Sequence, residues 1–415
     1  FVFFFTVLPN AFALLASTFL YIFLSDIPLS FIIIRLLRSY DDFILLYIPF
    51  FVLAGRVMTE AQISDKLIKL ADLLVGRLKG GLGHINVVVS MFFGGCTGTA
   101  ISDTSAIGSI MIPSMVKENY PKDFSAAVTA ASSTMGPIIP PSLMFILYGS
   151  IAQVSIRDLF IAGAIPGIMI GIFQMGVVSA KAHMKNYPKR DKKIPVKEAL
   201  KIIKDAIWAL MLPFIIMGGI ISGVVSPTEA AVIAVFYVFF IALFIYRTLN
   251  IRQILIIVKD SAVETGAISI LLAAASIFGW VLANEQVPQR LAGFLMNSTA
   301  AKWQILLIIN MIFFIVGMFM DSIPAVLILA PVFLSVFKMI GVDPLHAGIF
   351  MCVNLITGLA TPPVGCCLFA ASTISREPFE RVSKAVIPFV LANIAVTLLV
   401  TYIPSISLFL PSFFR

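Results

Sequence analysis

The sequence predicts an all-α polytopic membrane protein that is built as an inverted repeat. Of its 415 residues, 60% are hydrophobic and only 12% are charged, against about a quarter in soluble domains. The mean hydropathy is +1.04, and apolar runs approach the roughly 20 residues that a helix needs to cross a bilayer. The chain also matches itself at a fixed shift, described below. Together these observations exclude a soluble globular enzyme.

The basic residues predict the orientation in the membrane. The net charge of +8 is not gathered on one face that could bind nucleic acid. Instead, 22 of the 29 Lys and Arg residues lie in segments that fall on the same side of the membrane. This assignment takes the stretches 84–116 and 303–340 as re-entrant hairpins, for the reason given below. By the positive-inside rule, that side faces the cytoplasm. The segments are 56–83, 117–123, 181–206, 247–260 and 375–384.

Other common kinds of site are not indicated. The four cysteines lie in apolar segments without CxxC spacing, so neither a disulfide framework nor a zinc site is predicted. The three histidines are scattered along the chain. No GxxxxGK[ST] loop occurs, which argues against a pump driven by ATP.

Two apolar stretches, 84–116 and 303–340, are too long for one crossing and too interrupted for a clean pair. We interpret both as re-entrant helical hairpins that enter and leave on one side of the membrane. Two further segments, 124–150 and 347–374, are predicted to be broken helices because Gly-x-x-x-Pro-Pro interrupts each one.

These features form two related halves. Gly136 to Pro141 aligns with Gly358 to Pro363, a shift of 222 residues, and Gly95 aligns with Gly317 at the same shift. The charge pattern places the two copies upside down relative to each other. We therefore expect a first repeat at 1–206, which ends in a basic cytoplasmic loop, and a second repeat at 207–415. Secondary transporters use this construction because two inverted copies can exchange the side to which a central site opens.

Three smaller patterns complete the prediction. Ile63 to Lys79 and Val287 to Met296 are amphipathic and are expected to lie at the membrane interfaces. Ser226-Pro227-Thr228-Glu229 is a capping pattern at a helix start. The chain begins with Phe1, well short of a first crossing, so we expect the natural start to lie upstream.

The breaks locate the expected site. Irregular backbone at membrane depth is costly unless it is buried in protein or lines a wet cavity. Carbonyl and hydroxyl oxygens at the breaks are hard ligands that suit Na⁺, and helix N-termini there favour an anionic group. We expect one cation at each hairpin and broken-helix pair, with Thr99, Ser142 and Asp321 near the substrate.

Asp103 and Asp321 are the acidic residues nearest the breaks. A carboxylate at that depth costs at least about 2.5 kcal/mol unless it is compensated. Each is therefore a candidate for supporting a Na⁺ site or a proton-coupled step. The structural alternative is that each caps a helix at a hairpin tip.

Five runs closely resemble the large membrane subunit of tripartite ATP-independent periplasmic (TRAP) transporters, the DctM-like family. The resemblance covers essentially the whole chain. The runs are GGCTGTAISDTSAIGSIMIPSM (94–115), TAASSTMGPIIPPS (129–142), SPTEAA (226–231), GMFMDSIPAVLILAPVF (317–333) and GLATPPVG (358–365).

The resemblance implies a Na⁺-driven, elevator-type importer of organic acids, such as C4-dicarboxylates or sialic acids, in a bacterial inner membrane. It implies two partners, a small four-helix membrane subunit and a periplasmic substrate-binding protein. It also implies two or more Na⁺ ions, which bind at two sites in this chain. The first site comprises Thr97, Gly98, Gly136 and Pro141, and the second comprises Gly317, Asp321, Gly358 and Thr361.

Two alternatives stay open on the residues alone. One is a stand-alone carboxylate symporter, or an ion/proton antiporter, of related fold. The other is a membrane scaffold that transports nothing, although a scaffold has no need for two oxygen-rich breaks in register.

Overall fold

The computed structural model describes residues 10–25, 27–28, 30, 32, 34, 36, 47–61, 63–97, 99–189, 194–297 and 301–414. Every regular element in these ranges is a helix. Six helical segments are long and apolar enough to cross a membrane, which confirms the predicted fold class. They are Ile156–Met184, Pro227–Ile245, Ile251–Asn284, Lys302–Phe319, Ser322–Met339 and Phe379–Tyr402.

Both predicted hairpins and both predicted broken helices are present. The first hairpin is α5 (Gly81–Thr97) and α6 (Ala100–Lys117), and the second is α14 (Lys302–Phe319) and α15 (Ser322–Met339). The broken helices are split by irregular segments. The first consists of α7 (Lys122–Ser132), the short 3-10 helix η3 (Ser133–Met135) and α8 (Leu143–Ala152), and the second of α16 (Pro344–Gly358) and α17 (Cys366–Ser375).

The two halves keep the register that the sequence predicts. On the 222-residue shift, the start of α6 at Ala100 corresponds to the start of α15 at Ser322, and the end of α5 at Thr97 corresponds to the end of α14 at Phe319. The X-Pro peptide bonds Pro140–Pro141 and Pro362–Pro363 are both cis. Each half closes with a long helix, α9 (Ile156–Met184) or α18 (Phe379–Tyr402), and α19 (Pro404–Phe413) follows the second.

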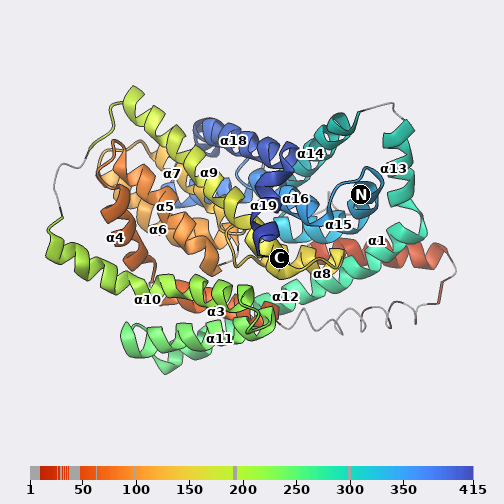
Figure 1. The fold of residues 1–415 in the computed structure, drawn as a ribbon, viewed down its shortest axis with the longest axis horizontal. Coiled ribbons are helices and arrows are strands. Elements are labelled where there is room, and N and C mark those ends of the chain that lie inside the picture. Colours follow the sequence, from red (N-terminus) through yellow and green to blue (C-terminus); the bar gives the residue numbers. More distant parts are fainter. Residues whose placement is uncertain are drawn as a thin grey trace.

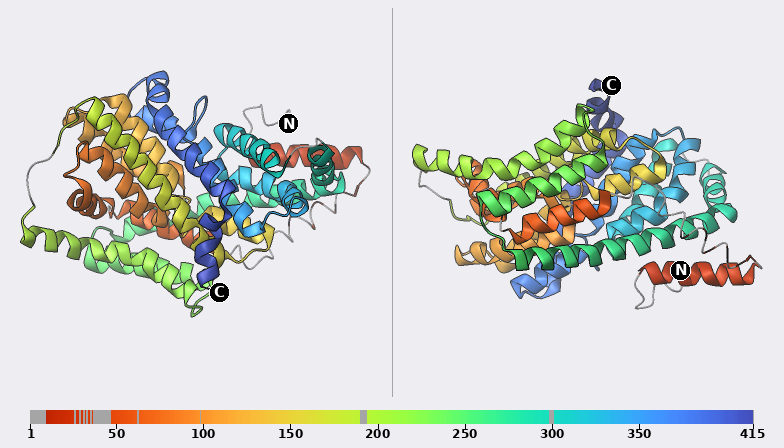
Figure 2. Two further views of the ribbon diagram at one scale, coloured as in Figure 1. Left: turned by 45° about the horizontal axis from the view of Figure 1, so that its top comes forward. Right: turned by 90° about the horizontal axis from the view of Figure 1, so that it is seen from below.

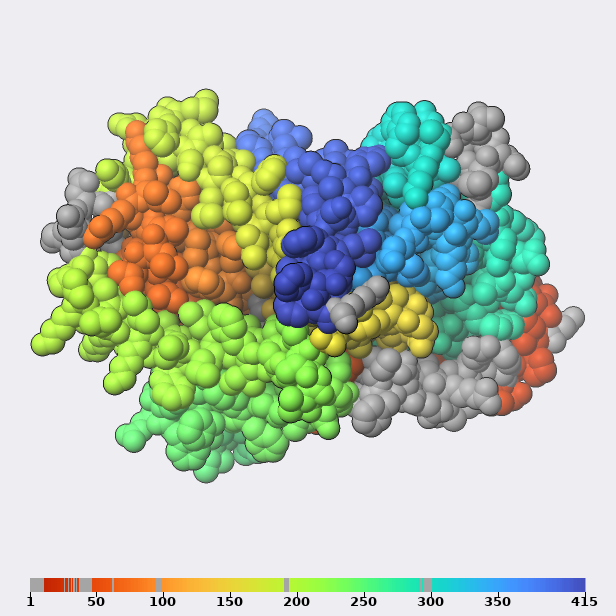
Figure 3. Space-filling view, viewed as in Figure 1, coloured from red at the N-terminus to blue at the C-terminus, as the bar shows by residue number. Residues whose placement is uncertain are grey.

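The remaining helices form a layer along one side of the molecule. Figure 1 shows α3 (Tyr47–Glu60), α10 (Val196–Ile221), α11 (Pro227–Phe240, continued by the π-helix η4, Ile241–Ile245) and α12 (Ile251–Asn284) below the hairpins and broken helices. The space-filling view shows α10 and α11 as a band along this lower edge (Figure 3). Helix α1 (Asn10–Leu24) packs against α12. We call α3, α10, α11 and α12 the lateral layer. We call the two hairpins and the two broken helices, which carry the breaks, the body.

The amphipathic segments lie at opposite ends of the molecule. Helix α4 (Ser64–Val75) lies at one end of the long axis and α13 (Val287–Asn297) at the other, as Figures 1 and 2 show. This arrangement agrees with an inverted repeat. The predicted capping box is also present, because Ser226 accepts a hydrogen bond from the Glu229 backbone and Glu229 accepts one from the Ser226 backbone.

The predicted boundary between the halves falls inside a helix. Helix α10 runs without interruption from Val196 to Ile221, so residues 197–206 are helical and no break in the helix marks the predicted boundary at 206/207. Between Pro195 and Pro213 the sequence contains neither proline nor glycine, and Ala, Leu, Lys and Glu favour a helix there. The high charge of this stretch predicts a loop, whereas the structure has a helix.

Helices of one half pack into the other half. Helix α8 of the first half contacts α15 of the second, and α17 of the second half contacts α6 and α7 of the first. At one such contact the Tyr148 ring lies directly on Gly348 of α16, and the Tyr148 hydroxyl donates a hydrogen bond to the Pro344 carbonyl at 2.8 Å. The halves therefore interlock and do not lie merely side by side.

Each hairpin is also joined to its broken helix by buried amides. In the first half, Asn86 Nδ2 donates to Thr129 Oγ1 at 2.7 Å. In the second, Asn354 Nδ2 donates to Asn310 Oδ1 at 2.6 Å. Because an unpaired amide is costly in a low-dielectric interior, these bonds hold each hairpin in register with its broken helix.

We predict that Gly348→Ala lowers the free energy of unfolding by about 1–3 kcal/mol, because the added Cβ would lie 2.5 Å from Tyr148 Cδ1 and the buried ring cannot withdraw. Denaturant unfolding of purified protein in detergent measures this change. The matched control is Gly266→Ala, a helix position where a Cβ would meet nothing within 4 Å. Equal stability of the two variants would contradict the proposed interlock.

Candidate functional site

The site is built around the breaks in the two hairpins and the two broken helices. In the first half, Gly94 near the end of α5 lies against Gly136, and a Cβ on Gly94 would sit 2.8 Å from the Gly136 Cα. The Asp103 carboxylate closes on Gly136 from α6, and its Cγ lies 3.0 Å from where a Gly136 Cβ would be. Backbone and carboxylate oxygens therefore gather at this break.

The second half repeats the contact. A Cβ on Gly358 would sit 2.7 Å from the Gly317 Cα, so the end of α14 touches the end of α16. Gly365 has a positive φ of 54°, and its backbone N–H donates to the Met318 carbonyl at 3.2 Å. This bond joins the break in the second broken helix to the tip of the second hairpin. Thr361 is buried, and its hydroxyl donates to the Thr357 carbonyl. The predicted residues Gly317, Gly358 and Thr361 are thus brought together.

The breaks of the two halves are covered by helices from both halves. Helix α8, which follows the first break, packs against α15 of the second hairpin. Helix α17, which follows the second break, packs against α6 and α7 of the first half. The two pairs of breaks therefore lie within one packed body.

Thr99 and Asp321 occupy equivalent positions, 222 residues apart, as the N-caps of α6 and α15. The Asp321 side chain accepts hydrogen bonds from the Ser322 backbone N–H at 2.6 Å and the Ser322 hydroxyl at 3.2 Å. Thr99 makes no side-chain cap bond. Of the other predicted ligands, Gly98 and the side chain of Thr97 lie outside the described residues.

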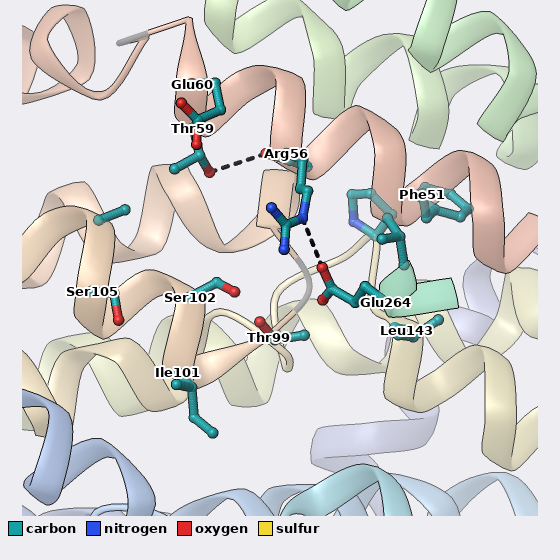
Figure 4. A pocket seen from close by; sticks show the side chains of 14 residues that line it. Phe51, Arg56, Thr59, Glu60, Thr99, Ile101, Ser102, Ser105, Leu143 and Glu264 are labelled. Carbon is teal, nitrogen blue, oxygen red and sulfur yellow. Dashed lines mark hydrogen bonds and ion pairs between the residues drawn. The ribbon is translucent and has the colours of Figure 1, made fainter. Parts of the chain in front are cut away.

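A cavity of about 250 Å³ lies beside the first break, between the lateral layer and the body. Thr99, Ser102 and Ser105 of the first hairpin line one wall, and Pro141 from the break also borders it. Figure 4 shows Arg56 of α3 and Glu264 of α12 on the other wall, pointing toward each other. The cavity thus combines hydroxyl groups with one cationic side chain, Arg56, and two carboxylates, Glu264 and Glu60.

Arg56 is the residue that the sequence prediction missed. Its Nε lies 2.9 Å from Glu264 Oε2, and its Nη1 lies 3.5 Å from Asp260 Oδ2. From the sequence, Arg56 counts only among the basic residues that predict the orientation, whereas the structure places it on α3 at the wall of the cavity. One signal was available, since Asp260 and Glu264 are four residues apart and share a helix face that needs a cation.

Ser142 does not line the cavity. It is the N-cap of α8, fully buried, and its hydroxyl donates to the Pro137 carbonyl and accepts from the Phe145 backbone N–H. Both hydrogen bonds of the hydroxyl lie within the turn that leads into α8. In this conformation Ser142 therefore stabilises the break and does not face the cavity.

The atoms at the breaks that could bind a metal ion are carbonyl, hydroxyl and carboxylate oxygens. Such ligands fit an alkali cation better than a transition metal. Among the described residues, no group of three or more His, Cys, Asp and Glu side chains is placed to hold a metal ion. Pro140 and Pro141 have no N–H, so they leave neighbouring carbonyls without a helical donor.

We predict that Ser142→Ala lowers the free energy of unfolding by about 1 kcal/mol, because α8 loses its N-cap. Thermal or denaturant unfolding in detergent provides the measurement. Thr373→Val, which removes an exposed hydroxyl that bonds only one turn back along its own helix, serves as the control. An unchanged stability for Ser142→Ala would mean that the hydroxyl has a different role.

Comparison with known proteins identifies the family. Residues 1–406 match the model of the tripartite ATP-independent periplasmic transporter, DctM component. The chain is 37% identical to the C4-dicarboxylate TRAP transporter large permease protein DctM of Pseudomonas aeruginosa, over 91% of this chain and 88% of that protein. It is 35% identical to the sialic acid TRAP transporter large permease protein SiaM of Vibrio cholerae, over 92% and 89%.

A solved structure shows the same fold. The YdaH transporter of Alcanivorax borkumensis superposes with a TM-score of 0.65 at 14% identity, over 90% of this chain and 88% of that one. The relatives are transporter permeases and not enzymes. The chain therefore belongs to the DctM family of TRAP transporter large permeases, multi-pass proteins of the bacterial inner membrane.

Proposed function

We propose that this permease is a Na⁺-coupled importer of an organic acid. We further propose that a periplasmic binding protein delivers the acid and that a small membrane subunit accompanies the permease. The observation that carries the proposal is the cavity between α3, α12 and the first hairpin. It places the Arg56 guanidinium, the hydroxyls of Thr59, Thr99, Ser102 and Ser105, and the Glu60 and Glu264 carboxylates beside a break whose oxygens suit a cation. An anion and a cation can therefore bind next to each other.

The proposed substrate is a small carboxylate. Arg56 can form charge-assisted hydrogen bonds with a carboxylate, and Thr99, Ser102 and Ser105 can hydrogen-bond its other oxygens. Glu264 and Asp260 already neutralise Arg56, so an entering carboxylate competes with them for the same donors. This competition keeps the guanidinium compensated when no substrate is bound.

The proposed coupling ions bind at the two pairs of breaks. The first site takes oxygens near Asp103, Gly136 and Pro141, and the second takes oxygens near Asp321, Gly358 and Thr361. Cations there would neutralise the buried Asp103 and the partly buried Asp321 carboxylates and lower the cost of holding an anion nearby. Filling of the Na⁺ sites and of the anion site would then favour each other.

The proposed mechanism is an elevator movement of the body against the lateral layer. The cavity lies between the two parts, so sliding of the body would carry Thr99 and Pro141 relative to Arg56 and Glu264. The interfacial helices α4 and α13 are suited to frame this movement at the two membrane surfaces. Inverted repeats supply two related end states for it.

Uptake of labelled carboxylates into proteoliposomes tests the proposal. The purified permease, with its small subunit, is assayed with and without binding protein, and with and without an inward Na⁺ gradient. We expect uptake only when both are present. Uptake that persists without binding protein would indicate a stand-alone symporter, and an absence of flux under every condition would indicate a scaffold.

We predict that Asp321→Ala lowers Na⁺-driven uptake at least tenfold while lowering folded yield much less, because a proposed cation ligand is removed. Asp343→Ala is the matched control, since Asp343 caps α16 by accepting from the Leu345 and His346 N–H groups and lies away from the breaks. The control should lose stability and keep its Na⁺ dependence. Parallel losses in both variants would assign Asp321 to capping alone.

We predict that Arg56→Gln raises the KM for substrate by about tenfold or more, because a hydrogen bond to a charged group contributes about 1.5–3 kcal/mol. Arg56→Lys should recover part of the affinity. Arg381→Gln provides the control, because it also breaks an Arg–Glu pair, but at the exposed surface. A normal KM for Arg56→Gln would exclude Arg56 from the substrate site.

A further inference from the structure

A closed ring of hydrogen bonds lies behind the first break, at the centre of the protein. Gln174 Nε2, from α9, donates to the Ala131 carbonyl at 2.9 Å and to Asn393 Oδ1, from α18, at 2.9 Å. Asn393 Nδ2 donates to Thr134 Oγ1 at 3.2 Å. Thr134 Oγ1 donates back to the Ala131 carbonyl at 2.6 Å. All four residues are fully buried.

The ring holds the end of a helix at the point where the chain becomes irregular. Helix α7 ends at Ser132, so the Ala131 carbonyl is among the last four, which lack the usual partner one turn further along. Thr134 lies in the 3-10 turn Ser133–Met135, and Gly136 follows directly. The ring therefore fixes the backbone that leads into the first break.

The two halves both contribute to this ring, but it serves only one of them. Ala131, Thr134 and Gln174 belong to the first half, whereas Asn393 belongs to the second. On the 222-residue shift, Ala131 corresponds to Val353 and Thr134 to Ile356. Ala131 acts through its backbone carbonyl, but Ile356 lacks the hydroxyl of Thr134, so the second broken helix cannot build the same ring.

The sequences of the long helices α9 and α18 also show that the ring is not duplicated. Pro166 in α9 and Pro388 in α18 correspond on the same shift. In that register Gln174 corresponds to Val396 and Asn393 to Gly171, so neither amide has a polar counterpart. The Asn310–Asn354 bond of the second half has its counterpart in the Asn86–Thr129 bond of the first, so the ring is additional to the bond that both halves share.

We propose that the Gln174–Asn393–Thr134 ring positions the backbone of the first cation site and thereby sets that site's affinity for Na⁺. The three side chains are positioning residues, since they act through the Ser133–Gly136 backbone and do not bind the ion. The second half thus tunes the cation site of the first half through Asn393. The part that concerns Na⁺ rests on the proposed function.

The test uses four variants of the full permease with its partners, reconstituted in proteoliposomes. Asn393→Leu and Thr134→Val each break the ring, and the second is close to isosteric. Thr134→Ser restores the hydroxyl. Thr397→Val is the matched control on α18, because it removes only a hydrogen bond to the Asn393 carbonyl within the helix. The measured quantity is the Na⁺ concentration for half-maximal uptake, together with the KM for the carboxylate at saturating Na⁺.

We expect Asn393→Leu and Thr134→Val to raise the half-maximal Na⁺ concentration about tenfold, as the loss of one or two buried hydrogen bonds would. The substrate KM at saturating Na⁺ should change less than about twofold, because the ring does not reach the substrate cavity. Thr134→Ser and Thr397→Val should stay within about twofold of the unaltered protein in both quantities. Well-folded Thr134→Val protein with an unaltered Na⁺ dependence would overturn the proposal, even if Asn393→Leu fails to fold.

A second measurement separates this inference from the proposed function. Hydrogen–deuterium exchange of the segment 131–142 should be faster in Thr134→Val than in Thr134→Ser, whatever ion drives transport. If the unaltered protein shows no Na⁺ dependence, the proposed coupling fails, and faster exchange would still support the positioning role. Equal exchange in the two variants would reject the ring as a positioning device.

Discussion

The architecture depends on the satisfaction of backbone polar groups where helices stop inside the membrane. Each break leaves carbonyl and N–H groups that lipid cannot satisfy. The protein meets this requirement by bringing glycine against glycine, Gly94 to Gly136 and Gly317 to Gly358, so that one break shields the other. Only residues without a Cβ allow the backbones to approach so closely. The same oxygens that must be kept from lipid are then available to hold a cation.

The interlock of the halves follows from this constraint. A broken helix cannot bury both of its pieces against its own hairpin, so α8 packs on α15 and α17 on α6 and α7. The breaks are thereby covered by helices from both copies. Movement of the body as a single unit is compatible with this packing, whereas separation of the two copies is not. The lateral layer meets the body across the cavity that contains Arg56.

Much of this could be predicted from the sequence, because the signals are local. Gly-x-x-x-Pro-Pro marks the broken helices, Ser226 to Glu229 marks a helix start, and the 222-residue shift relates the halves. Arg56 was missed because its partners Asp260 and Glu264 are some 200 residues away, and only the packing of α3 on α12 brings them together. The ring through Gln174 and Asn393 was missed for the same reason. Residues 197–206 were predicted as part of a loop but are helical, because charge density alone does not distinguish a charged helix from a loop.

Thr99 and Asp321 hold equivalent positions but differ in charge. One copy has a neutral hydroxyl at the helix start where the other has a carboxylate, while the first copy carries its acid one turn further along, at Asp103. Turning the molecule over in the bilayer would thus exchange the two copies in register but not in charge. A transmembrane voltage would act on a carboxylate at one helix start and on a neutral hydroxyl at the other, so the charges distinguish the two sides of the membrane where the repeat does not.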